Sequence, residues 1–299
     1  MDKKIAIIIL NWRTYKQTVK CIQSVKRSSY KNFTIIVVDN DSGDGSLEKL
    51  TEEFTDIHFI KNNTNAGYAG GNNLGIRYAL EHGFDYVWIL NPDTMVMEDT
   101  LSILVRFVDS KEMIASPQIM YMEEPEKIWF VDSTLSPLTG IATHLHHGEM
   151  DQGQFKNIID VPWIPGTALF VPRTVFEKVG LLDDGYFLFY EDVDFSVRVR
   201  EKGMSVSVIP EAKVQHFVGA VAGRGNPRNE YYVTRNRLYF LKKHSASLWW
   251  PLYAIYLLVR TCFASLKSRI QQRATIIQDE RMNGIIDFFK SRMGIKHVS

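Results

Sequence analysis

The first 120 residues alternate short apolar runs with segments of helical character. The apolar runs are rich in β-branched side chains and end in polar residues, a pattern typical of strands buried in a parallel sheet. Strands separated by helices imply βαβ units. The predicted strands are Ile5–Leu10, Phe33–Asp39, Ile57–Ile60 and Tyr86–Leu90, and the predicted helices are Tyr15–Arg27, Ser46–Phe54 and Asn73–His82.

The pattern changes after residue 111. Residues 112–172 contain six prolines and predict short strands and turns, with no long helix. Residues 173–202 return to helical character around an acidic cluster, and residues 205–218 predict one more strand and a loop. We therefore predict an α/β fold, with a mostly parallel central sheet flanked by helices, a small mixed-sheet portion and a C-terminal helical tail.

Composition is that of an ordinary folded protein, with 299 residues, 45% hydrophobic and 23% charged. It excludes a disordered chain, a low-complexity chain and a disulfide framework, because the two cysteines, Cys21 and Cys262, are far apart in sequence. Two cysteines without CxxC spacing suggest neither a zinc site nor an oxidising compartment. The run after Lys4 is six residues long and stops at Asn11, so it predicts a strand rather than a signal peptide and favours the cytoplasm.

The net charge of +1 hides an asymmetry along the chain. Residues 1–234 carry 23 Lys and Arg against 31 Asp and Glu, whereas residues 235–299 carry 12 against 3. An acidic body with a basic tail predicts an acidic surface as partner. The tail also contains an uncharged apolar run over residues 248–259. Basic residues beside such a run favour an anionic membrane over nucleic acid.

Polar residues follow the predicted strands, at the edge where parallel α/β sheets bind ligands. Asp39 ends the second strand, where its carboxylate could accept a hydrogen bond from the imide N–H of uracil or thymine; the loop after it also fits a simple turn and helix cap. Asp93, in Asn91-Pro92-Asp93 after the fourth strand, suits a hard divalent cation that bridges a diphosphate, although the same tripeptide is strong turn chemistry. Residues 65–75 are a Gly- and Asn-rich turn before a helix, suited to phosphate or sugar oxygens.

Two further groups lie in the second half. Glu191, Asp192 and Asp194 follow an aromatic stretch over residues 186–190. Acids in a first helical turn are often caps, but a partly dry aromatic wall would raise a carboxylate pKa toward that of a general base. His216 alone would more often be a structural histidine. We assign His144, His146 and His147 to an exposed loop or strand.

Taken together and in this order, these segments resemble glycosyltransferase family 2, in particular the bacterial branch with rhamnosyltransferases and other cell-surface polysaccharide enzymes. The resemblance covers about residues 4–244. It rests on IIILNW (7–12), VVDNDSGDGS (37–46), NAGYAGGNNLGIRYAL (65–80), ILNPDT (89–94), IPGTALFVPR (164–173), FLFYEDVDFSVRVREKG (187–203), VQHFVG (214–219) and YYVTRNRLYFLKKH (231–244).

The resemblance implies the GT-A fold, a nucleotide-sugar donor, a divalent metal (Mg²⁺ or Mn²⁺) and inversion at the anomeric carbon. Asp93 matches the last acid of the family's DxD motif, whose first acid is Asn91 here, and His216 matches a second metal ligand. The resemblance places the donor on Asn11, Trp12, Asp39, Asn65, Gly71, Asn73, Asn91, Asp93 and Arg235, the last of which would close over the diphosphate.

For the second half, the resemblance assigns catalysis to Asp192, with Glu191 beside it. Trp163, Gly166, Thr167 and Asp194 would face the acceptor. The implied domains are a catalytic domain over residues 1–244, with a nucleotide-binding half (1–111) and an acceptor half (112–244), and a basic amphipathic tail over residues 245–299.

The implied reaction moves a sugar from a dTDP-rhamnose or UDP-hexose type of donor to a hydroxyl of a glycan or a polyprenyl-linked glycan. The tail run is too short to span a bilayer and fits either an interfacial helix or a helix packed on the protein or a homodimer partner. We expect a cytoplasmic protein, peripheral on the inner face of the cytoplasmic membrane. The alternatives are a non-catalytic nucleotide-binding scaffold of a polysaccharide assembly complex and a sugar nucleotidyltransferase.

Overall fold

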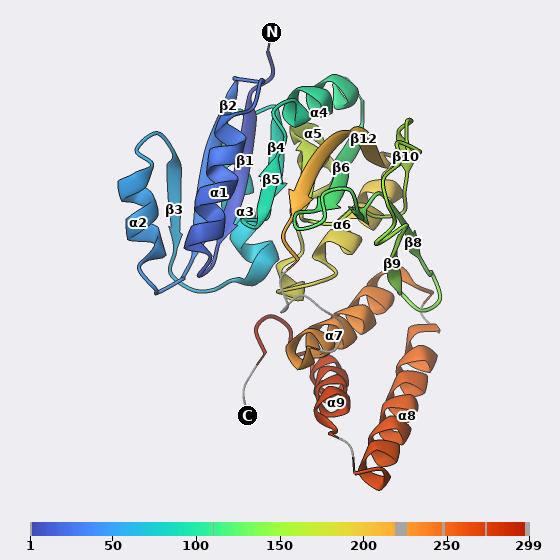
Figure 1. Ribbon diagram of the computed structural model, residues 1–299. Helices are drawn as coiled ribbons and strands as arrows, with labels where there is room; N and C mark the ends of the chain where they lie inside the picture. The colour runs from blue at the N-terminus through green and yellow to red at the C-terminus, as the bar shows by residue number, and fades with distance from the viewer. Residues whose placement is uncertain (1, 110, 219–225, 247–248, 273, 297–299) are drawn as a thin grey trace.

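The computed structural model describes residues 2–109, 111–218, 226–246, 249–272 and 274–296, and its centre is one large β-sheet (Figure 1). The strand order is β10-β12-β6-β11-β4-β1-β2-β3, with β5 paired to β12 and β7 to β6. A separate hairpin consists of β8 and β9. The strands are β1 (Ile5–Asn11), β2 (Phe33–Asn40), β3 (His58–Asn62), β4 (Tyr86–Leu90), β5 (Thr94–Val96), β6 (Met113–Tyr121), β7 (Ile128–Phe130), β8 (Asp132–Leu135), β9 (Ala142–Leu145), β10 (Ile159–Asp160), β11 (Ala168–Pro172) and β12 (Ser205–His216).

The strands of the N-terminal half are parallel, as predicted, because β1 pairs in parallel with both β2 and β4, and β2 with β3. The second half is mixed. There β11 runs antiparallel to both β4 and β6, whereas β6 and β12 are parallel to each other. Since β1, β2 and β4 run in one direction, their carboxyl ends lie together at the edge that faces α7, α8 and α9 (Figure 1).

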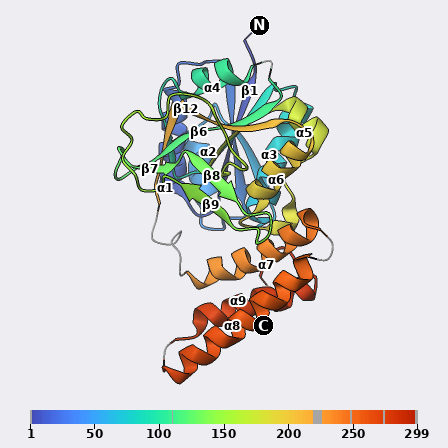
Figure 2. The same cartoon turned by 90° about the vertical axis from the view of Figure 1, so that its right-hand side faces the viewer.

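Helices cover both faces of the sheet, with α1 and α4 on one side and α3, α5 and α6 on the other (Figure 2). The α/β class predicted from the sequence is confirmed. The helices are α1 (Tyr15–Lys26), α2 (Ser46–Glu53), α3 (Gly67–Glu81), α4 (Thr100–Val108), α5 (Arg173–Val179), α6 (Glu191–Glu201), α7 (Pro227–His244), α8 (Trp249–Ile270) and α9 (Ile276–Phe289), with a 3₁₀ turn, η1, at Asp184–Tyr186.

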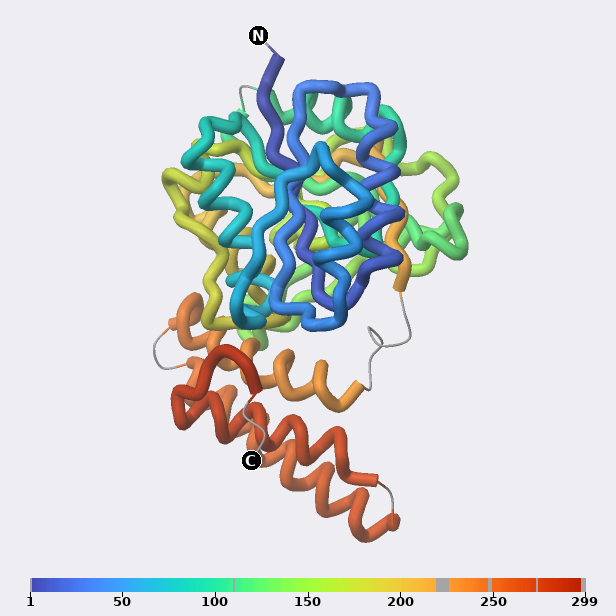
Figure 3. The backbone as a smooth tube through the Cα atoms, turned by 90° about the vertical axis from the view of Figure 1, so that its left-hand side faces the viewer, coloured from blue at the N-terminus to red at the C-terminus, as the bar shows by residue number. Residues whose placement is uncertain are grey.

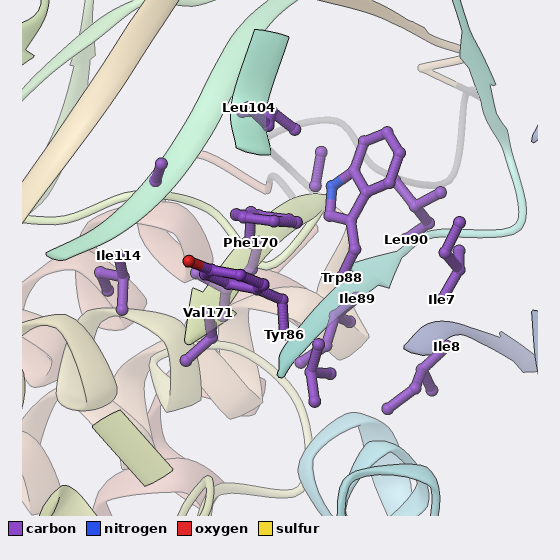
Figure 4. Packing of buried hydrophobic residues seen from close by; sticks show 14 of the residues in the cluster. Ile7, Ile8, Tyr86, Trp88, Ile89, Leu90, Leu104, Ile114, Phe170 and Val171 are labelled. Carbon is purple, nitrogen blue, oxygen red and sulfur yellow. The ribbon is translucent and has the colours of Figure 1, made fainter. Parts of the chain in front are cut away.

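The core is continuous across the junction of the two halves of the sheet (Figure 4). Trp88 on β4 is fully buried, and its ring meets the ring of Phe170 on β11 edge to face at 6.5 Å. Tyr86 stacks on the same phenylalanine at 5.1 Å. These large aromatic contacts stabilise the antiparallel pairing of β4 and β11, which brings the loop before β11 next to the polar end of β4.

Helix α3 begins earlier than predicted, at Gly67 instead of Asn73. The glycines were interpreted as a turn because glycine is a poor helix former. In the structure they are needed for close packing on the sheet. A Cβ atom at Gly71 would lie 2.5 Å from a methyl carbon of Leu10, and one at Gly75 would lie 2.8 Å from a methyl carbon of Ile8.

The last three helices lie together below the α/β body, and α8 and α9 extend away from it side by side (Figure 3). Leu238 and Leu241 of α7 share one buried cluster with Leu257 of α8 and Phe288 of α9. The same cluster includes Trp163 and Tyr190 of the α/β body, so α7 also packs against the body. No helix within the described ranges is long and apolar enough to cross a membrane. Leu248 and Arg273, which the tail prediction included, lie outside the described residues.

Candidate functional site

Asp39 lies at the carboxyl end of β2 and is buried, as are Ser42 and Ser46 in the segment that follows it. Its carboxylate accepts hydrogen bonds from Asn11 Nδ2 at 2.7 Å and from the hydroxyl and backbone N–H of Ser42 at 2.6 and 3.1 Å. Asp39 still lines a hollow of about 290 Å³, as does Lys61, its neighbour on β3. A nucleotide base can therefore contact the Asp39 carboxylate only from the side that Asn11 and Ser42 do not occupy.

Asn11 does not line that hollow, contrary to the role implied by the resemblance. Its side chain is fully buried, and its amide also donates to the Ser46 hydroxyl at 2.9 Å and accepts from Thr14 and Thr18. An amide with so many partners has no capacity left for a ligand. Asn11 instead fixes Asp39 and the loop after it in place.

The resemblance places the donor on both Trp12 and Asp39 in one pocket, but Trp12 lies in a different hollow from Asp39. This hollow, of about 170 Å³, is bordered by Trp12, Asn65, Tyr68 and the exposed Arg228. The Arg228 guanidinium carbon lies 5.6 Å from the centre of the Trp12 ring, a cation–π distance. Cation and ring together form a wall suited to a phosphate or a sugar.

The resemblance also places the donor along Asn65, Gly71 and Asn73. Two of these three residues have structural roles instead. Gly71 packs on Leu10, as described above. Asn73 is buried, donates to the carbonyl of Leu182 at 2.9 Å and accepts from its N–H at 3.2 Å. These bonds attach α3 to the segment before η1. Of the three, Asn65 alone lines a hollow in the described structure.

A cleft of about 420 Å³ gathers predicted residues from distant parts of the sequence. It opens between the ends of β4 and β12, the loop before β11 and the start of α6. The following predicted residues line it: Asn91, Asp93, Trp163, Gly166, Thr167, Glu191, Asp192 and His216. The ordered motifs therefore converge on one cavity.

Asp93 and His216 face each other in this cleft. The pairing of β5 with β12 brings them together, and His216 Nε2 lies 3.3 Å from Asp93 Oδ1. Asp93 Oδ1 is buried without a hydrogen-bond partner, and so is His216 Nδ1. A carboxylate oxygen and an imidazole nitrogen at this spacing fit a divalent cation. Because no cluster of three or more ligand side chains occurs in the described ranges, a cation there would need further ligands from a diphosphate or water.

Asp192 is held by backbone donors at the start of α6. Its Oδ2 accepts from Gly166 N at 3.0 Å and its Oδ1 from Val193 N at 2.8 Å. Burial raises the pKa of Asp192, although these N–H groups oppose the rise. Burial, and then the charge of Asp192, raises the pKa of Glu191 well above its ordinary value. Glu191 Oε2 is buried and has no partner. Burial and mutual repulsion thus disfavour the charged forms of these two neighbouring carboxyl groups, the Asp192–Glu191 dyad.

The backbone just before the dyad is strained. Phe187, Phe189 and Tyr190 all have positive φ angles, at 66°, 68° and 75°. The Asn236 amide on α7 donates to the carbonyls of Leu188 and Phe189, both at 2.8 Å, and stabilises this conformation. Strain of this kind in non-glycine residues persists only where the surroundings enforce it, and it is often found at functional sites.

Asp194 does not face the acceptor side, and this corrects its predicted role. Its fully buried carboxylate contacts Arg198 at 2.7 Å, and both Lys243 and His244 at 2.8 Å. Burial acts to raise the pKa of Asp194, but the His244 hydrogen bond and the charges of Arg198 and Lys243 outweigh it and hold the pKa well below its usual range. Asp194 therefore joins α6 to α7.

Arg235 was predicted to close over the diphosphate, and the structure contradicts this. The side chain is fully buried, and its guanidinium donates to the carbonyls of Tyr186 at 3.0 Å and Gly294 at 2.7 Å. Its Nε–H also donates to Asn236 Oδ1 at 2.9 Å, so the guanidinium is engaged within the protein interior. The exposed Arg228, which the sequence interpretation missed, is the cation that borders a ligand-sized hollow. Arg228 lies seven residues before Arg235 on the same helix, about two turns earlier.

Three more residues of the cleft were missed. Trp129 stands between two histidines, with ring-centre distances of 4.7 Å to both His144 and His216. His144, assigned to an exposed position with His146 and His147, is instead half-buried and lines the cleft on β9. Burial lowers the pKa of His144 to about 4, so the imidazole is neutral at pH 7. Tyr68 also lines the cleft and donates to the Gly166 carbonyl at 2.5 Å.

The fold is that of the GT-A glycosyltransferases. A family model described as "Glycosyl transferase family 2" matches residues 5–180, more than half of the chain. The chain belongs to glycosyl transferase family 2, as its motifs indicated.

Curated relatives and solved structures agree with this assignment. The chain is 29% identical over 206 residues to the low-salt glycan biosynthesis hexosyltransferase Agl10 of Haloferax volcanii, covering 68% of this chain and 63% of that protein. It is 25% identical over 258 residues to the dTDP-rhamnosyl transferase RfbF of Shigella flexneri, covering 83% of each. The crystal structure of GalNAc-T7 with UDP, GalNAc and Mn²⁺ has the same fold, with a TM-score of 0.66 at 13% identity, over 96% of this chain and 56% of that one.

Proposed function

We propose that this protein is a metal-dependent, inverting glycosyltransferase with Asp192 as its general base. The reaction moves a sugar from a dTDP-rhamnose or UDP-hexose type of donor to a hydroxyl of a glycan or polyprenyl-linked glycan in cell-surface polysaccharide synthesis. One observation carries the proposal: the Asp93–His216 pair and the Asp192–Glu191 dyad line the same cleft. Sugar transfer needs one group of residues that stabilises the charge of the leaving diphosphate and another that removes the proton of the acceptor hydroxyl.

Asp93 and His216 would hold Mg²⁺ or Mn²⁺, since Asp93 Oδ1 has no hydrogen-bond partner and lies 3.3 Å from His216 Nε2. Such an ion supplies neutralising charge for the leaving diphosphate. Among the relatives of the fold, GalNAc-T7 is described with Mn²⁺ and UDP. Arg228 beside Trp12 would add a second positive charge on the nucleotide side, in place of the buried Arg235.

Asp192 takes the proton from the acceptor hydroxyl. Because both of its oxygens accept backbone hydrogen bonds, the carboxylate has a fixed orientation toward the cleft. The hydroxyl oxygen then attacks the anomeric carbon from the face opposite the nucleotide, the bond to the diphosphate breaks, and the configuration inverts. The raised pKa of Glu191 favours its neutral form beside Asp192, which limits repulsion between the two carboxyl groups.

Aromatic side chains form the sugar side of the cleft. Trp129 and Trp163 supply flat apolar surfaces that suit the C–H face of a sugar ring, while the neutral His144 offers a nitrogen acceptor to a hydroxyl. Asp39 would select a pyrimidine nucleotide through its imide N–H. Rhamnose is the favoured donor sugar because the relative RfbF bears the name of a dTDP-rhamnosyl transferase.

The setting proposed for this reaction is the cytoplasm, at the inner face of the cytoplasmic membrane. Both cysteines are free thiols, buried at Cys21 and exposed at Cys262, in agreement with a reducing compartment.

Thermal unfolding with a panel of nucleotides tests the donor site directly. UDP or dTDP should raise the unfolding temperature when Mn²⁺ is present and should do so much less after chelation, whereas GDP should have little effect. Turnover of dTDP-rhamnose or a UDP-hexose with release of the nucleoside diphosphate then selects the sugar. If no pyrimidine nucleotide stabilises the protein with or without metal, the catalytic proposal fails and a scaffold role takes its place.

A further inference from the structure

Helix α8 exposes one continuous apolar face to solvent. Six large apolar side chains at helical spacing are between 46% and 73% exposed. We call this set the α8 stripe, and it consists of Leu252, Ile255, Val259, Phe263, Leu266 and Ile270. A monomeric protein rarely leaves so many neighbouring apolar side chains in water, so the stripe indicates an interaction surface.

The opposite face of the same helix is already in use. Tyr253, Ala254 and Leu257 are buried in the cluster that includes Ile285 and Phe288 of α9. The two roles weighed for the tail, packing on the protein and exposure to a partner, therefore belong to opposite faces of one helix. Packing on α7 and α9 holds α8 in a fixed orientation and keeps the stripe outward.

Positive charge borders the stripe on both sides. At 3.6 residues per turn, Arg260 and Lys267 project about 60–80° to one side of the stripe, and Arg269 about 100° to the other. The sequence from residue 245 to residue 278 contains no Asp or Glu. An apolar face flanked by cations, on a helix that contains no acid, matches a surface of acyl chains beneath anionic headgroups.

We propose that the α8 stripe docks the protein on an anionic lipid bilayer, with α8 lying in the plane of the interface. Trp249 and Tyr256, near the N-terminal end of the helix, are partly exposed and suit the headgroup level. A second copy of the chain fits the stripe less well. The stripe is centred near residue 261, so a two-fold contact between antiparallel α8 helices would bring Arg260 close to its own copy.

A vesicle-binding experiment on the full chain tests the stripe without any need for a sugar substrate. Cys262 is exposed on α8 and Cys21 is buried, so an environment-sensitive fluorophore can be attached selectively beside the stripe. Vesicles with equal parts of phosphatidylglycerol and phosphatidylcholine should shift the dye emission to the blue and pellet the protein at low salt. Vesicles of pure phosphatidylcholine should do so at least about tenfold less, because the electrostatic attraction is missing.

Matched variants separate the stripe from general effects of charge. The double variant Phe263→Glu with Leu266→Glu should lower binding to the anionic vesicles more than about tenfold. Met150→Glu, which places the same charge at another exposed apolar residue, should bind like the wild type. Unfolding temperature and UDP binding of the double variant, measured in parallel, show that the cleft is intact.

Two results would overturn the proposal. One is a wild-type protein that stays in the supernatant with anionic vesicles at low salt. The other is a dimer in light scattering that the double variant converts to a monomer, with no vesicle binding by either, which would assign the stripe to a second copy. Neither result bears on the donor site, because the nucleotide test does not involve lipid.

Discussion

The Asp192 carboxylate accepts a hydrogen bond from the backbone N–H of Gly166 at 3.0 Å, and Gly166 in turn offers its carbonyl to the Tyr68 hydroxyl. Gly166 belongs to the loop before β11, and Tyr68 lies in the first turn of α3. A side chain at position 166 has no room, because a Cβ there would lie 2.5 Å from the Tyr68 hydroxyl oxygen. The proposed base is thus positioned by contacts that extend into the nucleotide-binding half.

Asp192→Asn should lower the rate of sugar transfer by about 10²–10⁴-fold, because the variant cannot remove the acceptor proton. The affinity for UDP or dTDP should change little. Steady-state kinetics and nucleotide binding by calorimetry measure the two effects. Transfer at the wild-type rate in this variant would remove Asp192 from the mechanism.

Asp93→Asn and His216→Gln should each abolish the part of the nucleotide-induced thermal shift that depends on Mn²⁺. The reason is that Asp93 Oδ1 and His216 Nε2, 3.3 Å apart, are the facing donor atoms of the cleft. Glu123→Gln, at an exposed carboxylate, serves as the control and should keep the full shift. An unchanged response to Mn²⁺ in both cleft variants would place the metal elsewhere.

Arg228→Gln and Arg235→Gln should have opposite phenotypes. The first removes an exposed cation beside Trp12, so UDP affinity should fall about tenfold while the unfolding temperature stays close to that of the wild type. The second leaves buried carbonyls without donors and should destabilise the protein by about 2–3 kcal/mol. Denaturant unfolding and nucleotide titration of both variants distinguish the roles, and a reversal of the two results would restore Arg235 as the diphosphate ligand.

Asp194→Asn should cost about 3 kcal/mol at neutral pH, because Arg198, Lys243 and His244 lose their common partner. The pKa of Asp194 is lowered in the folded protein, so its contribution is present above the ordinary Asp range and is lost as the pH falls below about 4. The wild type and the variant should therefore converge in acid. Asp160→Asn, which breaks the exposed pair with Arg200, should cost less than about 1 kcal/mol. Equal losses in the two variants would contradict the assignment.

Glu191→Gln should stabilise the protein relative to the wild type, and by more at pH 8 than at pH 5. The pKa of Glu191 is raised in the folded state, so the native protein binds this proton more tightly than the unfolded chain does. Wild-type stability must then decrease as the pH rises above about 4.3, the ordinary Glu value, whereas the variant lacks this group. Unfolding temperatures of both proteins across this range provide the test. A difference that does not vary with pH would show that Glu191 titrates normally.

The buried strands could be predicted because burial on both faces produces short, continuous apolar runs, and β4 at Tyr86–Leu90 has the predicted bounds. The start of α3 could not, since the need for glycine at position 71 arises from Leu10 on another element. Contacts of this kind are formed only in the fold and leave no local pattern.

The same distinction applies to the site. The sequence identified Asp93, Asp192 and His216, which lie at strand ends or at the start of a helix, and the structure brings them into one cleft. It could not distinguish Arg235 from Arg228, because both occur in one basic segment and differ only in what surrounds them after folding. His144 was misplaced for a similar reason, since its burial depends on Trp129 and Trp163.

The bonds from Arg235 to residues near the C-terminus limit how far the chain can be shortened. Gly294 accepts from the Arg235 guanidinium, and its own N–H donates to the Gly185 carbonyl at 3.2 Å, next to the aromatic loop before Glu191. A truncated protein that ends after α7 would keep every residue of the cleft but leave a buried arginine without an acceptor from α9 onward. The residues around Gly294 thus help to hold the loop before Glu191 in place. A chain that ends at residue 244 would lose these contacts.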